Sequence, residues 1–258
     1  MNERPARSTL KVAGYQRWNQ LAFLHWTLPP ELVQPLLPAS LHVLTRDGAA
    51  WMGAVLFSME RIRPWWSPPV PGISWFLETN VRTYVRHESG KTGVWFFSLD
   101  ANGRVAVEVG RRVWNLNYVL SRMTMSNAAE STTKSDSDGA ARILHYTGQR
   151  RRHPAGYDVT VQIGDEQAAP AAPGTLEYFL AERYRLFTLN RQGQLLAGLV
   201  DHEPYRVKPA QVSHVRQTLL AAALNDRTAG VAENQFPVHA MFSEGVDVRV
   251  GRLRPVRD

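Results

Sequence analysis

The 258-residue sequence predicts an α+β protein dominated by antiparallel strands, with a few short helices. Short segments rich in β-branched and aromatic residues follow one another, and turn residues separate them at hairpin spacing. Few helical patterns interrupt these segments, which argues against a doubly wound parallel sheet. A closed or nearly closed barrel would let so many strands avoid exposed edges. The composition agrees, because 44% hydrophobic and 21% charged residues are ordinary for a folded domain.

Strands are predicted throughout the first half of the chain, each bounded by turn residues. They span residues 41–44, 50–59, 74–87, 93–100 and 105–116. The Asp47-Gly48 dipeptide is a strong hairpin signal. Residues 29–38 predict a short helix that begins and ends at proline, whereas residues 10–26 lack clean periodicity. The segment 63–72 is too rich in proline for regular structure, so its tryptophans need cover from neighbours.

The second half of the chain continues the pattern of hairpins and adds two helical segments. Strands are predicted at residues 142–147, 157–163, 185–189, 195–201 and 245–253. Gly174-Thr175 is expected to cap a helix over residues 176–184, and residues 209–224 have apolar side chains at helical spacing. Residues 127–141 are small and polar without periodicity, which predicts a flexible loop.

Several classes of chemistry lack support in the sequence. The absence of cysteine excludes disulfides, thiolate nucleophiles and iron–sulfur clusters. Neither a dinucleotide-binding glycine motif nor a serine nucleophile elbow occurs, and no histidines stand at metal-ligand spacing. We therefore expect no cofactor and no metal. The N-terminus has no signal-peptide pattern and no run approaches the ~18 apolar residues of a membrane span, so a cytoplasmic protein without a membrane partner is expected.

The chain is basic, with a formal net charge of +7, and 26 of its 30 basic residues are arginine. Arginine binds carboxylates and phosphates through a two-pronged fork, so nucleic acid is one partner to consider. The arginines cluster at residues 150–152 and at Arg252, Arg254 and Arg257. Neither cluster forms a long stripe interleaved with aromatic residues, which favours solvated surface charge over a nucleic-acid site.

The most informative segment is the strand expected at residues 74–87. Because strand side chains alternate between faces, Glu78, Asn80, Arg82 and Tyr84 share one side of it. The simplest interpretation is an amphipathic strand with this side in water. If the strand belongs to a barrel with the polar side inward, a ligand site becomes the better account, because buried charges persist when they are paired or used.

Three further groups of polar residues stand near this strand in the sequence. Ser98 shares a face with Asp100, where the simplest interpretation is a strand running into a polar turn. In the segment after Gly110, Arg111 lies on the side opposite to Tyr118 if the segment is extended. Glu182 has arginines nearby, and a structural ion pair is the expected role for it.

The order of these segments resembles the YqjF-like bacterial family of the acetoacetate decarboxylase-like fold group. The resemblance covers about residues 18–253 and rests on His25-Trp26, residues 29–38, 47–51, 76–85, 93–100 and 179–184, His202-Glu203-Pro204 and residues 245–248. It implies a single domain over residues 1–258, built around a conical β-barrel with helices outside.

Activity carries over from this resemblance less well than the fold. Acetoacetate decarboxylases form a Schiff base through a lysine that follows a short Gly-Arg strand. That strand resembles Gly110-Arg111, but Leu116-Asn117-Tyr118 follows here without a lysine. Schiff-base decarboxylation is therefore not expected. The resemblance also implies a polar barrel lumen in which Glu78 and Arg82 face the cavity.

The leading hypothesis is a barrel whose lumen binds a small organic acid. Arg82 or Arg111 would hold the carboxylate, Glu78 would act as general acid or base, and Tyr118 would occupy the region of the missing lysine. The further ligand contacts expected are Asn80, Tyr84 and Ser98. Non-covalent acid–base catalysis is one version of this hypothesis, and binding alone is the other. The alternatives are a basic surface for nucleic acid and a ligand-free scaffold in which Glu78 and Arg82 neutralise each other.

Overall fold

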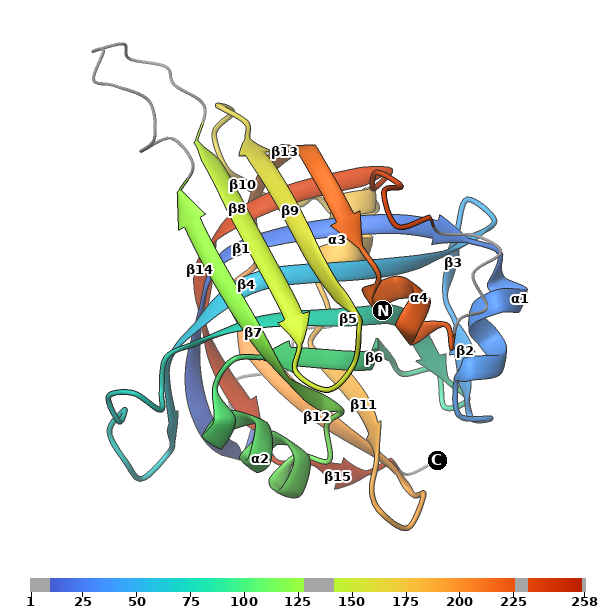
Figure 1. Cartoon of the computed structure of the whole chain (residues 1–258). Helices are drawn as coiled ribbons and strands as arrows, with labels where there is room; N and C mark the ends of the chain where they lie inside the picture. The colour runs from blue at the N-terminus through green and yellow to red at the C-terminus, as the bar shows by residue number, and fades with distance from the viewer. Residues whose placement is uncertain (1–9, 128–141, 226–231, 257–258) are drawn as a thin grey trace.

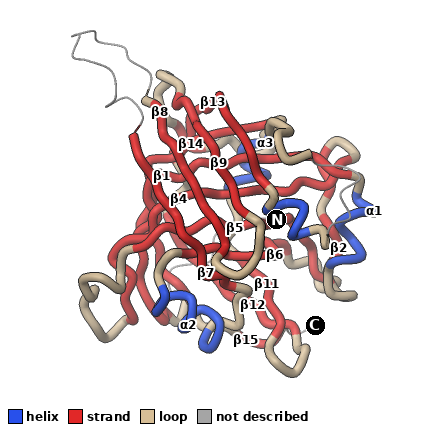
Figure 2. Tube along the Cα trace, viewed as in Figure 1, coloured by secondary structure: helices blue, strands red, loops and turns tan. Residues whose placement is uncertain are grey.

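The computed structural model describes residues 10–127, 142–225 and 232–256 (Figure 1). Apart from Asn127, the loop expected at residues 127–141 lies outside the described residues, as does Arg257. Strands dominate the described chain and its helices are short, so the predicted fold class is confirmed. Figure 2 shows α1 and α2 at the periphery of the strands. None of the helices in the described ranges is long and apolar enough to cross a membrane.

The elements follow one another with few long connections. The strands are β1 (Val12–Leu28), β2 (Leu41–Val43), β3 (Thr45–Arg46), β4 (Ala49–Pro64), β5 (Phe76–His87), β6 (Thr92–Ala101), β7 (Tyr118–Asn127), β8 (Ile143–Arg150), β9 (Gly156–Ile163), β10 (Ala169–Pro170), β11 (Arg185–Leu189), β12 (Leu195–His202), β13 (Arg206–Gln217), β14 (His239–Gly251) and β15 (Arg254–Pro255). The helices are α1 (Pro30–Val33), which a 3-10 turn at Gln34–Leu36 follows, α2 (Arg104–Val113), α3 (Leu176–Ala181) and α4 (Leu219–Ala223).

The strands close into a ring that is close to a barrel. Going round it, β14 pairs with β13, and β9, β8, β7, β6, β5, β4 and β1 follow before the path returns to β14. A shorter path from β6 to β14 runs through β11 and β12. The pairings are antiparallel except those of β6 with β7 and with β11. Closure pairs the edges of the long strands and so protects them from other chains.

Strands β1, β4 and β5 form a wall that is buried on both faces. Alternate side chains along β1 go to opposite sides of it, Leu24 and Trp26 to one and Leu21 and Phe23 to the other. From Leu21 onward β1 is buried on both faces, which explains why residues 21–26 show no polar face in the sequence. In Figure 1, β7, β8, β9 and β13 cross in front of the wall.

The wall separates two interiors. The packed interior lies between the wall and β7, β8, β9 and β13, and its buried apolar residues include Leu24, Trp26, Met52, Leu56, Val81, Leu144, Tyr157, Val161 and Leu220. The hollow interior lies between the wall and β6, β11, β12, β14 and α2, and its buried apolar residues include Leu21, Phe23, Val55, Phe57, Leu99, Tyr118, Val200 and Val250. Each interior takes one side chain in two from every wall strand.

Two predictions of secondary structure were wrong. The strand expected at residues 105–116 is helix α2, because Val107 and Gly110 share a helical face that packs onto the neighbouring strands. Its β-branched valines favour a strand in isolation, and this packing overrides that preference. The helix expected at residues 209–224 is mostly strand β13, and α4 takes up its last residues. Thr175 does cap α3, since its hydroxyl accepts from the backbone N–H of Tyr178.

Candidate functional site

A cavity of about 310 Å³ lies in the hollow interior. Side chains of β1, β4, β5, β6, β11, β12 and β14 border it, together with α2 and the segment 64–74. Most of these side chains are apolar, such as Phe23, Val55 and Leu99. Deeply buried polar or charged residues interrupt the apolar lining: Ser74, Glu78, Asn80, Arg82, Tyr118, Arg183 and Tyr205. A concave apolar site with a few convergent polar groups is the usual form of a small-molecule site.

The alternation of β5 brings Glu78, Asn80 and Arg82 to the cavity face of the wall. The hydroxyl of Tyr118 donates to Oε2 of Glu78 at 2.8 Å. Burial raises the pKa of Glu78 to about 7, while the hydrogen bonds from Tyr118 and Asn80 act in the opposite direction. Glu78 thus changes between acid and base near neutral pH. Burial also raises the pKa of Tyr118 well above its ordinary value, so this phenol keeps its proton.

Tyr118 depends on helix α2 for its position. The backbone of Gly110 approaches the Tyr118 ring so closely that an ideal Cβ there would lie 2.3 Å from Cδ2. Glycine therefore lets α2 cover the ring while the hydroxyl reaches Glu78. The helix ends directly after this contact, where Asn115 adopts a left-handed φ of 49° and the chain turns into β7.

Of the arginines that border the cavity, Arg82 and Arg183 are the deeply buried ones. Arg82 and Arg183 are each 7% exposed, and both border the cavity. Nη2 of Arg82 donates to the carbonyl oxygen of Leu180 at 3.0 Å, and Arg183 lies over the Phe179 ring at 4.7 Å. The Nε atom of each guanidinium is buried and has no hydrogen-bond partner in the described chain. Burial lowers the pKa of Arg183 to about 10, which leaves it charged at neutral pH.

These guanidinium groups lack a paired carboxylate. Among the described residues, neither Arg82 nor Arg183 forms an ion pair within 4.0 Å. Glu78 bonds to Tyr118 and Asn80 instead of Arg82, so the mutual neutralisation of the scaffold alternative is not what the structure shows. The charge of Glu182 does act on Arg183, although its carboxyl also accepts from the backbone N–H of Tyr205 at 3.0 Å.

Tyr84 lies behind the cavity, and it does not border it. Its hydroxyl donates to the carbonyl oxygen of Leu180 at 3.0 Å and lies 3.0 Å from Nε2 of His25. The same carbonyl accepts from Arg82, so Tyr84 and Arg82 are tied to one point at the end of α3. Tyr84 is thus a support for the arginine, and the structure does not bring it to the cavity as the expected ligand contact.

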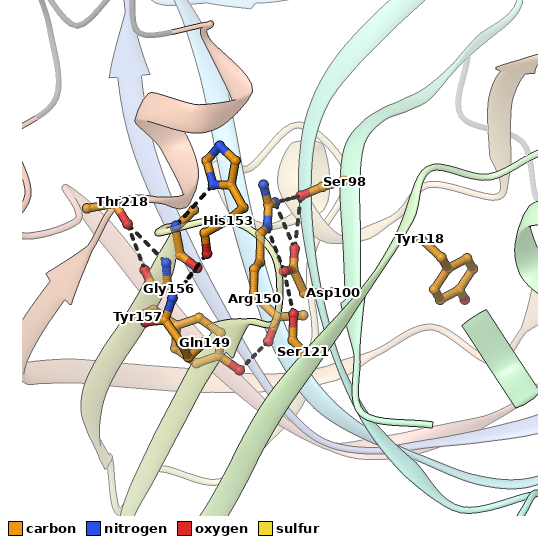
Figure 3. Close-up of polar contacts among 12 residues, drawn as sticks. Ser98, Asp100, Tyr118, Ser121, Gln149, Arg150, His153, Gly156, Tyr157 and Thr218 are labelled. Atoms are coloured by element: carbon orange, nitrogen blue, oxygen red, sulfur yellow. Dashed lines mark hydrogen bonds and ion pairs between the residues drawn. The ribbon is translucent and has the colours of Figure 1, made fainter. Parts of the chain in front are cut away.

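Ser98 faces the packed side of β6. Its hydroxyl donates to Oδ2 of Asp100 at 3.1 Å and accepts from Nη2 of Arg150 at 2.7 Å. Arg150 also holds Oδ1 and Oδ2 of Asp100 at 2.8 and 2.9 Å, and Ser121 completes the cluster. Figure 3 shows this cluster with Tyr118 lying apart from it. Ser98 is therefore not assembled with the cavity residues.

Arg111 is not in the cavity either. Its side chain is 47% exposed on α2, and its Nε donates to the carbonyl oxygen of Tyr118 at 2.8 Å. Of the two arginines expected to hold a carboxylate, the structure thus brings Arg82 to the cavity and leaves Arg111 outside. Arg150, which the nucleic-acid alternative needs at the surface, has a side chain that is 10% exposed and paired with Asp100.

Sequence reasoning missed Arg183. The segment Glu182-Arg183-Tyr184 suggested an ion pair, yet Arg183 turns into the cavity beside Arg82. Its position depends on α3 and on the parallel pairing of β11 with β6, which join residues far apart in the chain. No local sequence pattern predicts such a contact.

The described chain offers neither a lysine at the cavity nor a cluster of metal-ligating side chains. Lys11, Lys91 and Lys208 do not border the cavity, and Lys134 lies outside the described residues. Within the described ranges, no group of three or more histidine, aspartate or glutamate side chains is arranged to hold a metal ion. The cavity chemistry that the described residues offer is that of one carboxyl group together with phenol, hydroxyl, amide and guanidinium groups.

Comparison with known proteins places the chain in a family. Residues 15–247 match DUF2071, described as an uncharacterized conserved protein. The uncharacterized protein YqjF of Bacillus subtilis (strain 168) is 32% identical over 196 residues, which cover 76% of this chain and 75% of that protein. The chain belongs to the DUF2071 family. The YqjF-like resemblance of the sequence is thereby confirmed.

Solved structures show the same fold for this DUF2071 chain. Acetoacetate decarboxylase from Legionella pneumophila has a TM-score of 0.63 at 13% identity, covering 100% of this chain and 93% of that one. The enduracididine biosynthesis enzyme MppR, complexed with pyruvate, has a TM-score of 0.58 at 13% identity, covering 95% and 91%. At these identities the likeness shows the fold, which agrees with the acetoacetate decarboxylase-like prediction.

Proposed function

We propose that this protein binds a small organic acid in the cavity, with the carboxylate of the ligand on Arg82 and Arg183. The observation that supports this proposal is the pair of buried guanidinium groups without an ion pair among the described residues. A buried charge is costly unless a partner compensates it. An anionic ligand would supply that partner and use the Nε donors, since carboxylates match the planar fork of arginine.

Glu78 supports an extension of this proposal to catalysis. Burial raises the pKa of Glu78 to about 7, and a general acid or base works best when its pKa is near the working pH. The Glu78 carboxylate would take a proton from the carbon beside a ligand carbonyl, which leaves an enolate, and the protonated Glu78 would then return a proton to that carbon. Tyr118 would hold Glu78 in place through the hydrogen bond that its hydroxyl donates to Oε2. This step is an enolisation, and it needs no lysine.

The structural neighbours are compatible with this ligand class. MppR is complexed with pyruvate, which is a small keto acid. The Legionella protein is an acetoacetate decarboxylase. Both share the fold with this chain and little sequence, so they indicate ligands to test first.

Binding is tested by a thermal-shift screen of small carboxylates and keto acids. The wild type should gain stability with an acid that binds the cavity, by about 2.7 kcal/mol at one hundred times Kd. Arg183→Met and Arg82→Met should lose that gain. Arg112→Met is the matched control, because its side chain is 71% exposed on α2 and it should keep the gain. The proposal fails if no acid shifts the wild type, or if Arg112→Met loses the shift as completely as Arg183→Met.

Catalysis is tested separately with a keto acid found in that screen. Exchange of the hydrogens beside its carbonyl for deuterium, followed by NMR, should be faster with the wild type and should rise with pH around pH 7. Glu78→Gln should remove this acceleration by at least about 100-fold and leave the affinity within severalfold. Retained exchange in Glu78→Gln would reject the acid–base role and leave a binding protein.

A further inference from the structure

Exposed apolar side chains gather where the cavity meets solvent. Trp65, Trp66, Val70 and Ile73, all between β4 and β5, are 58%, 71%, 45% and 44% exposed. The sequence predicted cover for these tryptophans, and that prediction was wrong. Val70 and Ile73 also border the cavity, so this apolar segment is continuous with its lining.

Helix α2 borders the same opening with a second apolar surface. Val105, Val109 and Val113 follow at intervals of four residues and are 49%, 45% and 63% exposed. Val107 and Gly110 lie on the buried face of the helix. Val105 and Val109 border the cavity, whereas Val113 does not. An amphipathic helix ordinarily buries its apolar stripe, so an exposed one at a cavity mouth points to a ligand or partner.

The deeply buried charged groups of the cavity are Glu78, Arg82 and Arg183. Most of the remaining border is apolar, as at Phe57, Ile73 and Val109. It also includes a smaller set of polar residues: Gln16, Asn80, Tyr118, Arg63, Ser67, Ser74, Arg185 and Tyr205. A short polar acid would satisfy the arginines and leave the apolar walls in contact with water. Burying those walls against an apolar body is favourable in proportion to the area covered.

We infer that the ligand is an amphiphilic carboxylic acid, whose apolar chain or ring runs from the arginines along the cavity to the mouth between α2 and residues 65–74. This inference rests on the proposed function, because it takes the arginines as the carboxylate site. It adds that the larger part of the binding free energy comes from the apolar body, and that Val105, Val109 and Ile73 are covered when the ligand is bound.

Isothermal titration calorimetry with straight-chain acids from acetate to octanoate tests the inference. Each added methylene should raise the affinity about fourfold until the chain reaches the mouth. Octanol, which lacks the charge, should bind far more weakly than octanoate. If short acids bind and added methylenes do not raise the affinity, the inference is overturned and the proposed function stands. If no acid of any length binds, the proposed function fails as well.

A pair of variants on one helix locates the apolar body. Val109→Ser changes a residue of the cavity border, and Val113→Ser changes an exposed valine one turn further along that does not border it. Both valines are largely exposed, so neither change should impair folding. Val109→Ser should weaken octanoate about tenfold and leave acetate unchanged, and Val113→Ser should leave both unchanged. Equal octanoate affinity in the two variants and the wild type would show that the apolar body does not reach the mouth and would overturn the inference.

Discussion

The packed and hollow interiors share one wall, and they treat buried charge in opposite ways. On the packed side, Arg150 and Asp100 form a two-pronged ion pair that the hydroxyls of Ser98 and Ser121 complete. On the hollow side, Arg82 and Arg183 are equally buried and form no ion pair within the described chain. A charge that is satisfied within the fold stabilises a structure, and a charge left without a partner beside a cavity indicates a site.

The two interiors differ in filling as well. A void bordered by Leu24, Trp26 and Leu56 in the packed interior is about 10 Å³, against about 310 Å³ for the cavity of the hollow one. Since each wall strand divides its side chains between the two, the difference cannot come from strand composition alone. It comes from what lies opposite. A four-stranded layer of β7, β8, β9 and β13 covers one face, whereas β6, β11, β12 and β14 lie across the other face together with Arg183, Gly110 of α2 and the segment 64–74.

The largest expected effect is a difference in unfolding free energy between replacing Arg150, which has an ion pair, and replacing Arg183, which has none in the described chain. Arg150→Met leaves the Asp100 carboxylate buried without a counter-ion and should cost about 3–5 kcal/mol of unfolding free energy. Arg183→Met removes a buried charge that has no ion pair in the described chain, so it should change stability by less than about 1 kcal/mol or raise it. Urea unfolding at pH 7 measures both, with the exposed Arg151→Met as control. A loss for Arg183→Met as large as that for Arg150→Met would mean that Arg183 holds the fold together.

Glu78 gives the hollow interior its own dependence of stability on pH. Burial raises the pKa of Glu78 from 4.5 to about 7, so the folded state binds more protons than the unfolded chain between these values. Stability contributed by the protonated carboxyl is therefore present below about pH 4.5 and is lost as the pH rises through 7, by roughly 3 kcal/mol in total.

The difference between wild type and Glu78→Gln isolates this contribution from other titrating groups, such as His25. In urea unfolding experiments, the unfolding free energy of the wild type minus that of Glu78→Gln should fall steadily from pH 5 to pH 8. The glutamine variant is then relatively more stable at the alkaline end. A difference that stays constant over this range would show that Glu78 titrates at its ordinary pKa. The hollow interior would then not raise the pKa of its buried carboxyl group.

Local chemistry explains how much of this fold the sequence predicts. Turn residues such as Asp47-Gly48 specify hairpins directly, and β3 with β4 forms one as expected. Ring closure depends on the pairings of β13 with β14 and of β5 with β6, and no turn signal specifies the former, because its partners are joined through α4 and a longer connection. The failure at residues 10–26 has a physical reason in its second half, since from Leu21 onward the strand is buried on both faces and has no polar side to reveal its period.

The candidate site, like the fold, could be predicted where it depends on local pattern and not where it depends on tertiary packing. Glu78, Asn80 and Arg82 lie on one strand, so simple alternation brings them to one face, and whether that face meets water or a cavity depends on the rest of the ring. Arg183 reaches the same cavity by tertiary packing and could not be placed from its neighbours in sequence. Arg111 was misplaced because the extended segment expected around it is a helix, which turns its side chain outward.

A matched pair of glycines sharpens the comparison at the level of single methyl groups. An ideal Cβ at Gly148 would lie 2.2 Å from Cε1 of Tyr157, and one at Gly110 would lie 2.3 Å from Cδ2 of Tyr118. Both tyrosines are 8% exposed and each is hydrogen-bonded to β5, Tyr157 with Thr79 and Tyr118 with Glu78. The two sites thus differ chiefly in whether the displaced ring has somewhere to go.

Gly148→Ala should cost about 1–3 kcal/mol, because Tyr157 is enclosed by the packed interior and must strain its surroundings. Gly110→Ala should cost less, because Tyr118 can move into the cavity and alanine favours the α2 helix by about 0.5–1 kcal/mol. Gly110→Ala should also affect Glu78. With the hydrogen bond from Tyr118 broken, the pKa of Glu78 should rise further, which moves the loss of stability to higher pH. Urea unfolding across pH 5 to 9 measures both effects, and equal costs at the two glycines would mean that the cavity cannot accept even a displaced ring.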